Sequence, residues 1–61
     1  MADAELSSIT STLADLARRI ESLAAAHEKD GRSDVAVDLY EVERSLNAGV
    51  RRLTKLVNSR Q

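Results

Sequence analysis

Apolar residues in the first half of the chain recur at alternating spacings of three and four residues. This alternation is the heptad repeat of a coiled-coil seam, in which positions a and d face a neighbouring helix. The next a position after the last apolar residue of the repeat falls on His27. The pattern therefore predicts one long helix over about residues 3–30, with this seam: Leu6, Ile9, Leu13, Leu16, Ile20 and Leu23.

The second half carries the same repeat in a different phase. Leu39, Leu46 and Leu53 take position a, and Val35, Val42, Gly49 and Leu56 take position d. From His27 to Leu39 the chain advances 12 residues, which is one heptad plus five, whereas a continuous coiled coil absorbs insertions of three or four. The helix must therefore break between the two repeats.

The break falls on a short polar segment around Gly31. Glycine suits the left-handed residue that follows a helix end, and Ser33 suits the N-cap of a second helix. We therefore expect a loop at about residues 31–33 and a second helix over about residues 34–59. A loop this short joins antiparallel neighbours. The fold class is all-α, with residues 1–61 forming a single antiparallel helical hairpin.

Folding the chain about Gly31 also predicts the register, because facing residues should then have numbers that sum to about 62. Seven seam pairs sum to 62: Leu6–Leu56, Ile9–Leu53, Leu13–Gly49, Leu16–Leu46, Ile20–Val42, Leu23–Leu39 and His27–Val35. The expected core within one chain consists of eleven aliphatic residues: Leu6, Ile9, Leu13, Leu16, Ile20, Leu23, Leu39, Val42, Leu46, Leu53 and Leu56.

A second stripe of small or apolar residues follows positions e and b on one flank of this seam, whereas the g positions of the other flank are mostly polar. We expect the stripe to meet its copy in a second chain, which gives a two-fold symmetric four-helix bundle. A tetramer, or a different helical protein as partner, stays open because Val37 and Ala25 lie on outer positions. The expected interface is Ala14, Ala17, Ala24, Ala36, Tyr40, Gly49, Val50 and Val57.

Length and composition independently favour association. A chain of 61 residues buries too little surface to be comfortably stable alone, and without Cys it forms no disulfide or thiolate metal site. Nine Lys and Arg against ten Asp and Glu give a net charge of −1, so no overall field attracts nucleic acid or anionic lipid. No apolar run is long enough for a membrane span, and the acidic start argues against a signal peptide. We expect a cytoplasmic protein without membrane contact.

Candidate chemistry is sparse. His27 is the only imidazole, and although Glu28 and Asp30 follow it closely, a metal site needs about three or four ligands and a catalytic histidine needs a positioned partner in a pocket. We expect no catalytic, metal or cofactor site. Gly49 occupies a d position, where it indicates a close helix contact, a slot for a side chain such as Tyr40 of another hairpin, or a groove that admits a foreign helix.

A basic stripe on the second helix offers contacts to phosphate groups through Arg44, Arg51, Arg52 and Lys55. The absence of interleaved aromatic residues and the placement of bases near a helix C-terminus favour an ordinary solvated face. The sequence thus predicts a non-enzymatic protein-interaction or assembly module that acts as a homo-oligomeric helical bundle, most simply a homodimer. The alternative is a nucleic-acid-associated protein that uses this stripe. Binding to a membrane surface is disfavoured because self-association uses the apolar stripe.

Overall fold

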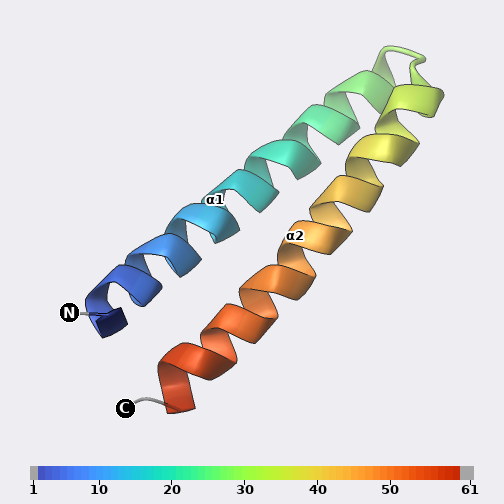
Figure 1. Ribbon diagram of the computed structural model, residues 1–61. Coiled ribbons are helices and arrows are strands. Elements are labelled where there is room, and N and C mark those ends of the chain that lie inside the picture. Colours follow the sequence, from blue (N-terminus) through green and yellow to red (C-terminus); the bar gives the residue numbers. More distant parts are fainter. Residues whose placement is uncertain (1, 60–61) are drawn as a thin grey trace.

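The computed structural model describes the backbone of residues 2–59 and the side chains of residues 4–59. Two helices, α1 (Ala2–Lys29) and α2 (Ser33–Ser59), run antiparallel and side by side, with the loop that joins them at one end (Figure 1). The resulting rod is 45 Å long. The prediction of an all-α helical hairpin is confirmed, and the helix bounds differ from the expected ones by about one residue.

The loop is closed by a Schellman motif. The N–H of Arg32 donates to the carbonyl of His27 at 2.8 Å, and the N–H of Gly31 donates to the carbonyl of Glu28 at 3.1 Å. Gly31 has a φ of +82°, a left-handed conformation that strains any residue with a Cβ. The expected role of this glycine at the helix end is confirmed.

The start of α2 differs from the prediction by one residue. The N–H of Ala36 donates to the carbonyl of Arg32 at 3.0 Å, so Arg32 accepts the first helical hydrogen bond. Ser33 is already the first residue of the helix, and its expected role as N-cap is wrong. The Schellman closure reverses the chain within Asp30 and Gly31, which leaves Arg32 free to begin the second helix at once.

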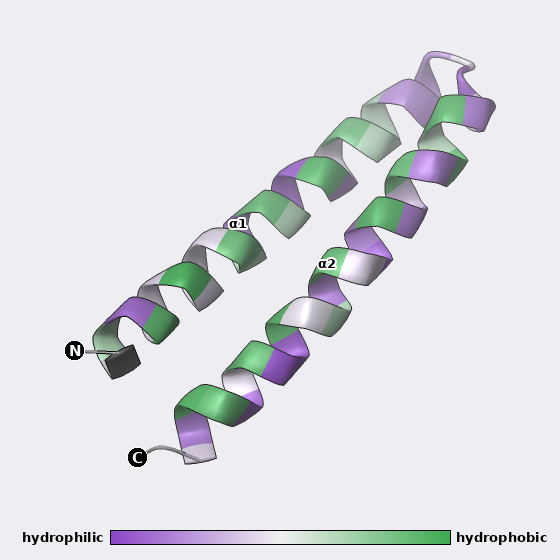
Figure 2. Cartoon of the chain, viewed as in Figure 1, coloured by the Kyte–Doolittle hydropathy of each residue, from purple (hydrophilic) through white to green (hydrophobic). Residues whose placement is uncertain are grey.

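The contact between the helices is built on alanine. Ala17, Ala24 and Ala36 are at most 2% exposed, and among the described residues no large side chain is fully buried. All three alanines occupy position e, beside the predicted seam. Leucine, isoleucine and valine recur on turn after turn of both helices (Figure 2), but none of them is buried as deeply as the alanines.

The two helices are therefore turned relative to the predicted seam, so that they meet between positions a and e rather than between a and d. The a residues are half-buried: Leu6, Leu13, Ile20, Leu39, Leu46 and Leu53. The d residues expected in the core are instead 40–50% exposed: Ile9, Leu16, Leu23, Val42 and Leu56. A methyl side chain lets two helix backbones approach more closely than a leucine does, which favours alanine at the line of contact.

The same rotation corrects the expected interface between chains. Ala17, Ala24 and Ala36 were expected to meet a second copy, but they are buried within one hairpin. The rest of that stripe is half-buried: Ala14, Tyr40, Gly49, Val50 and Val57. The register is less affected, because a Cβ built on Gly49 would lie 3.5 Å from Cδ2 of Leu13, its predicted neighbour across the hairpin.

Candidate functional site

The rotation leaves a row of large apolar side chains on one side of the hairpin. In an antiparallel pair the d positions of both helices fall on the same side, and the e positions fall on the opposite side. We call the side with the d positions the groove face. Its exposed apolar row is Ile9, Leu16 and Leu23 from α1 with Val42 and Leu56 from α2. Five large apolar side chains, each 40–50% exposed, therefore share one side of the hairpin.

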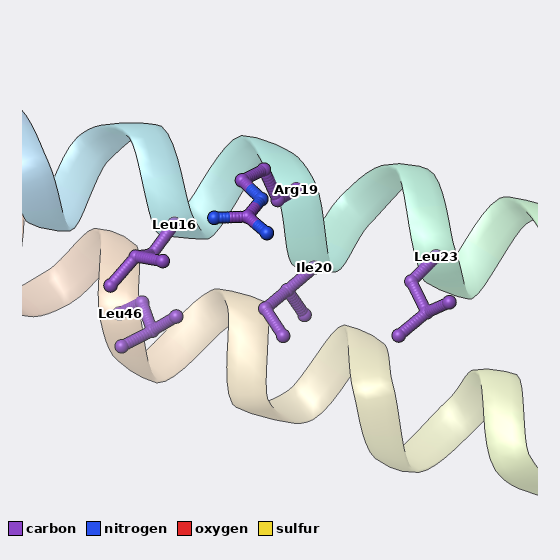
Figure 3. Close-up of a pocket in the computed structure, with 5 residues that line it drawn as sticks. All are labelled: Leu16, Arg19, Ile20, Leu23 and Leu46. Carbon is purple, nitrogen blue, oxygen red and sulfur yellow. The ribbon is translucent and has the colours of Figure 1, made fainter.

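An open groove runs along the middle of this face. Leu16, Ile20 and Leu23 of α1 line it together with Leu46 of α2 (Figure 3). Arg19 lies at its rim and is the only charged residue of its lining. The guanidinium of arginine stays protonated at every ordinary pH and donates hydrogen bonds without accepting any. The groove therefore offers an apolar surface with a cationic edge.

Charged residues of both signs flank the groove face at the g positions. Glu5 and Arg19 lie on α1, and Asp38 and Arg52 lie on α2. All four side chains are exposed, and none forms an ion pair within 4.0 Å with another described residue. The face thus carries two acids and two bases beside its apolar row, and its charges balance.

The opposite side of the hairpin, which we call the tyrosine face, is acidic. The hydroxyl of Tyr40 donates to Oε1 of Glu28 across the two helices at 3.4 Å, and the amide of Asn47 donates to the carboxylate of Glu43. Partial burial raises the pKa of Tyr40, and the carboxylates of Glu28, Glu21 and Glu43 raise it further. These three carboxylates therefore gather around one tyrosine, and the b and e positions of the described helices hold no Lys or Arg.

The other candidate residues lie apart from both faces or make local contacts. The half-buried His27 donates from Nδ1 to the carbonyl of Leu23 at 3.0 Å. Within the described part of the chain, no three side chains suited to metal binding gather. Arg44 is exposed and lies 3.7 Å from the carboxylate of Glu41.

The basic stripe predicted on α2 is divided between two sides of the helix. Arg44, Arg51 and Lys55 take outer positions and are exposed. Arg52 takes a g position and belongs to the groove face. Only the first three therefore remain together as a surface that is separate from the apolar row.

The spacing of the apolar residues alone predicts the groove-face row in the core, because spacing does not take the size of the side chains into account. One feature of the sequence indicates packing at position e instead: Ala17 and Ala24 are seven residues apart at that position of the first helix, where their small size permits close packing. A second signal was charge, because Glu21 and Glu43 on the same flank make a poor surface for two identical chains. Together these signals favour packing within the hairpin through the alanine flank.

Comparison with known proteins finds no relative. No family model matches the chain, and neither a curated protein nor a solved structure matches it. Over residues 2–59, no helix combines the length and the apolar character that a membrane crossing requires.

Proposed function

We propose that this protein is a small non-enzymatic protein-interaction or assembly module, which acts as a homo-oligomeric helical bundle and most simply as a homodimer of hairpins. One observation carries the proposal. The apolar row of the groove face is 40–50% exposed, whereas the side chains that one hairpin buries fully, within its described residues, are three alanines. Two hairpins that cover each other's row form a four-helix bundle.

The physical reason is the small core of a single hairpin. Removing apolar surface from water is the main favourable term in folding and scales with the area buried. An alanine contributes one methyl group, so three buried alanines give a far smaller term than the leucines that lie half outside. A second layer of helices converts the exposed parts of those leucines into core, and stability then depends on association.

The shape of the hairpin also favours binding over catalysis. A rod of two helices with an open groove exposes bound molecules to water, whereas catalytic sites exclude water and place an acid or base beside the reacting atoms. The one charged residue that lines the groove is Arg19, whose guanidinium donates hydrogen bonds and accepts none. A protein surface is the ligand that a long apolar row fits.

The proposal is tested by measuring mass and stability as protein concentration changes. Sedimentation velocity should give the mass of a dimer at high concentration and a smaller average mass on dilution. The thermal midpoint should rise with concentration because only the folded state associates. A monomeric mass together with a midpoint that is independent of concentration would refute self-association.

Nucleic-acid binding is the alternative, and one observation favours it: Arg44, Arg51 and Lys55 are exposed on a side that a groove-face dimer leaves uncovered. Binding through phosphate contacts weakens steeply as salt is added. Titration of generic duplex DNA and RNA at two salt concentrations distinguishes the two functions. Charge reversal at Arg51 and Lys55 should abolish such binding and leave the mass of the oligomer unchanged.

A further inference from the structure

We propose that a second copy of the chain covers the groove face and that the tyrosine face stays in water. This inference rests on the proposed self-association and names the surface that performs it. It also replaces the interface expected from the sequence, which followed the e and b positions. Three properties of the hairpin support it: the placement of the exposed apolar side chains, the distribution of charge and the spacing of the apolar row.

The first property is the exposure of large apolar side chains. On the groove face the apolar row is exposed to solvent along most of the length of the hairpin, from Ile9 near the open end to Leu23 near the loop. On the tyrosine face the alanines of position e are already buried between the helices, and Tyr40 is engaged with Glu28. A second copy therefore gains more apolar contact on the groove face.

The second property is charge. If two tyrosine faces met, Glu21, Glu28 and Glu43 of both copies would share one interface, and the described b and e positions hold no Lys or Arg to neutralise them. Like charges brought together across an interface oppose association. The groove face carries Glu5 and Asp38 with Arg19 and Arg52, so two copies present equal numbers of both signs to each other. Charge thus selects the groove face for a partner identical to itself.

The third property is the spacing of the apolar row. Because facing residue numbers sum to about 62, Leu56 lies level with residue 6 and Val42 lies level with residue 20 of α1. Together with Ile9, Leu16 and Leu23 they place the row at levels 6, 9, 16, 20 and 23, so neighbouring side chains are three or four residues apart except between Ile9 and Leu16, where Gly49 stands level with residue 13. Steps of three to four residues correspond to about 5 Å along a helix, the separation at which side chains of one helix fit between those of another. The row therefore has ridges and gaps that a copy of the same row can fill.

Gly49 widens one of these gaps. It is the d residue of α2 between Val42 and Leu56, and it has no side chain to fill its place in the row. Within the hairpin a Cβ at this position would lie in ordinary contact with Cδ2 of Leu13, at 3.5 Å, so the position has room for a methyl group. The glycine therefore leaves room in the groove face for an apolar side chain of the second copy.

The test compares two substitutions that each place a carboxylate on an exposed apolar residue. Leu23→Glu alters the groove face, whereas Val37→Glu alters an outer position of α2 that is 59% exposed. Sedimentation equilibrium should show that Leu23→Glu raises the dimer dissociation constant by about 30-fold or more, as expected when a carboxylate replaces an apolar side chain that the second copy buries. Val37→Glu should change it by less than about threefold. Circular dichroism checks that both variants stay helical.

A second measurement on the unaltered chain avoids the risk that Leu23→Glu fails to fold. A soluble paramagnetic chelate broadens the NMR signals of methyl groups that contact water. In the dimer, the methyl groups of Leu16 and Leu23 should be protected, whereas those of Val37 and of Ala14 on the tyrosine face should be broadened. Protection of Ala14 with broadening of Leu16 and Leu23 would overturn the inference.

Charge reversal gives a third, independent test of the groove face, and the neighbouring residue Arg18 serves as the matched control. Arg19→Glu leaves the groove face with three acids and one base, whereas Arg18→Glu changes an exposed arginine that pairs with Asp15 away from that face. At low salt Arg19→Glu should weaken the dimer several-fold more than Arg18→Glu, and added salt should reduce the difference. Equal effects of the two reversals would argue against the groove face.

The outcomes separate this inference from the proposed function. A chain that is monomeric at every concentration contradicts self-association itself. A different outcome is a chain that dimerises with a dissociation constant that Leu23→Glu leaves unchanged and with Leu23 methyl groups that the chelate broadens. That result keeps the proposed function but shows that the groove face is not the dimer surface. Specific binding of a different protein to the groove face of a monomeric chain likewise overturns the choice of a second copy.

Discussion

Replacing a buried alanine by leucine tests the packing of the hairpin most directly. Ala24 has 0% of its surface exposed, whereas Ala25, the next residue on the same helix, is exposed. Ala24→Leu and Ala25→Leu therefore add the same three carbon atoms to adjacent positions of α1, and only the first adds them between the helices. Helix propensity changes equally in both variants, so it cancels in the comparison.

The expected magnitude follows from the lack of space at Ala24. Side chains added to a closely packed contact push the backbones apart or take strained rotamers, at a cost of about 1–3 kcal/mol. For a domain of this size, each kcal/mol lowers the thermal midpoint by roughly 4–8 °C. Ala24→Leu should therefore lower it by about 4–24 °C, whereas exposed Ala25→Leu should change stability by no more than about 0.5 kcal/mol.

The assay is thermal unfolding for the midpoint and urea unfolding for the free energy, both followed by circular dichroism, with both variants and the parent chain at one protein concentration. Sedimentation velocity on the same samples shows whether the oligomer has changed. If Ala24→Leu were as stable as the parent or more stable, the added atoms would have found free space. The helices would then not pack through the alanines, and the core would instead follow the predicted seam of positions a and d.

Three further changes probe single features of the hairpin. Gly31→Ala should destabilise it by about 1–2 kcal/mol, measured by urea unfolding, because a left-handed residue gains a Cβ. Gly49→Ala should raise the free energy of unfolding of one hairpin by up to about 1 kcal/mol, because the Cβ meets Leu13 only at 3.5 Å and helix propensity improves. Tyr40→Phe should resist alkali better than the parent chain, since burial and Glu28 raise the pKa of Tyr40 above its ordinary 10.0.

The sign of the last effect follows from proton binding. The folded state holds the Tyr40 proton more tightly than the unfolded state, so this contribution to stability is complete below about pH 10 and is lost as pH rises through the folded-state pKa. Unfolding free energies measured from pH 8 to 12 should therefore fall more steeply for the parent than for Tyr40→Phe. Parallel curves would contradict the raised pKa of Tyr40.

The two glycine predictions have their own controls. Gly31→Asn should lower the free energy of unfolding less than Gly31→Ala does. A loss of single-chain stability in Gly49→Ala would mean that the space beside Leu13 is too small for a methyl group.

The helical hairpin follows from the sequence because spacing, loop and register all agree. Alternation of three and four residues requires helices, a phase shift of five requires a break, and Gly31 supplies the residue that a tight helix end needs. Leu13 lies beside Gly49, where a Cβ would be 3.5 Å from its Cδ2, in agreement with the predicted register. Each of these inferences depends on where residues stand along the chain, which a single sequence contains in full.

The rotation of each helix could not be obtained from spacing in the same way. The apolar stripe covers positions d, a and e, and two helices can meet on either side of a. Which side turns inward depends on how closely the backbones approach, and therefore on the difference between a methyl group at Ala24 and an isobutyl group at Leu23. Three alanines of the predicted interface are buried within one hairpin for this reason. Which large apolar side chains are exposed depends on this rotation, so spacing alone does not predict the groove face.

The buried alanines also shape how the hairpin opens. Ala17, Ala24 and Ala36 all lie in the half of the rod nearer the loop, where Ala24 and Ala36 are only 12 residues apart in sequence. Contacts between residues that are near in sequence form early and cost little loop entropy, whereas pairing at the open end must close almost the whole chain. Amide hydrogens near the loop should therefore exchange most slowly, with protection decreasing toward residues 2 and 59. We therefore expect the two helices to separate first at the open end of the hairpin, while the half that holds the buried alanines stays closed.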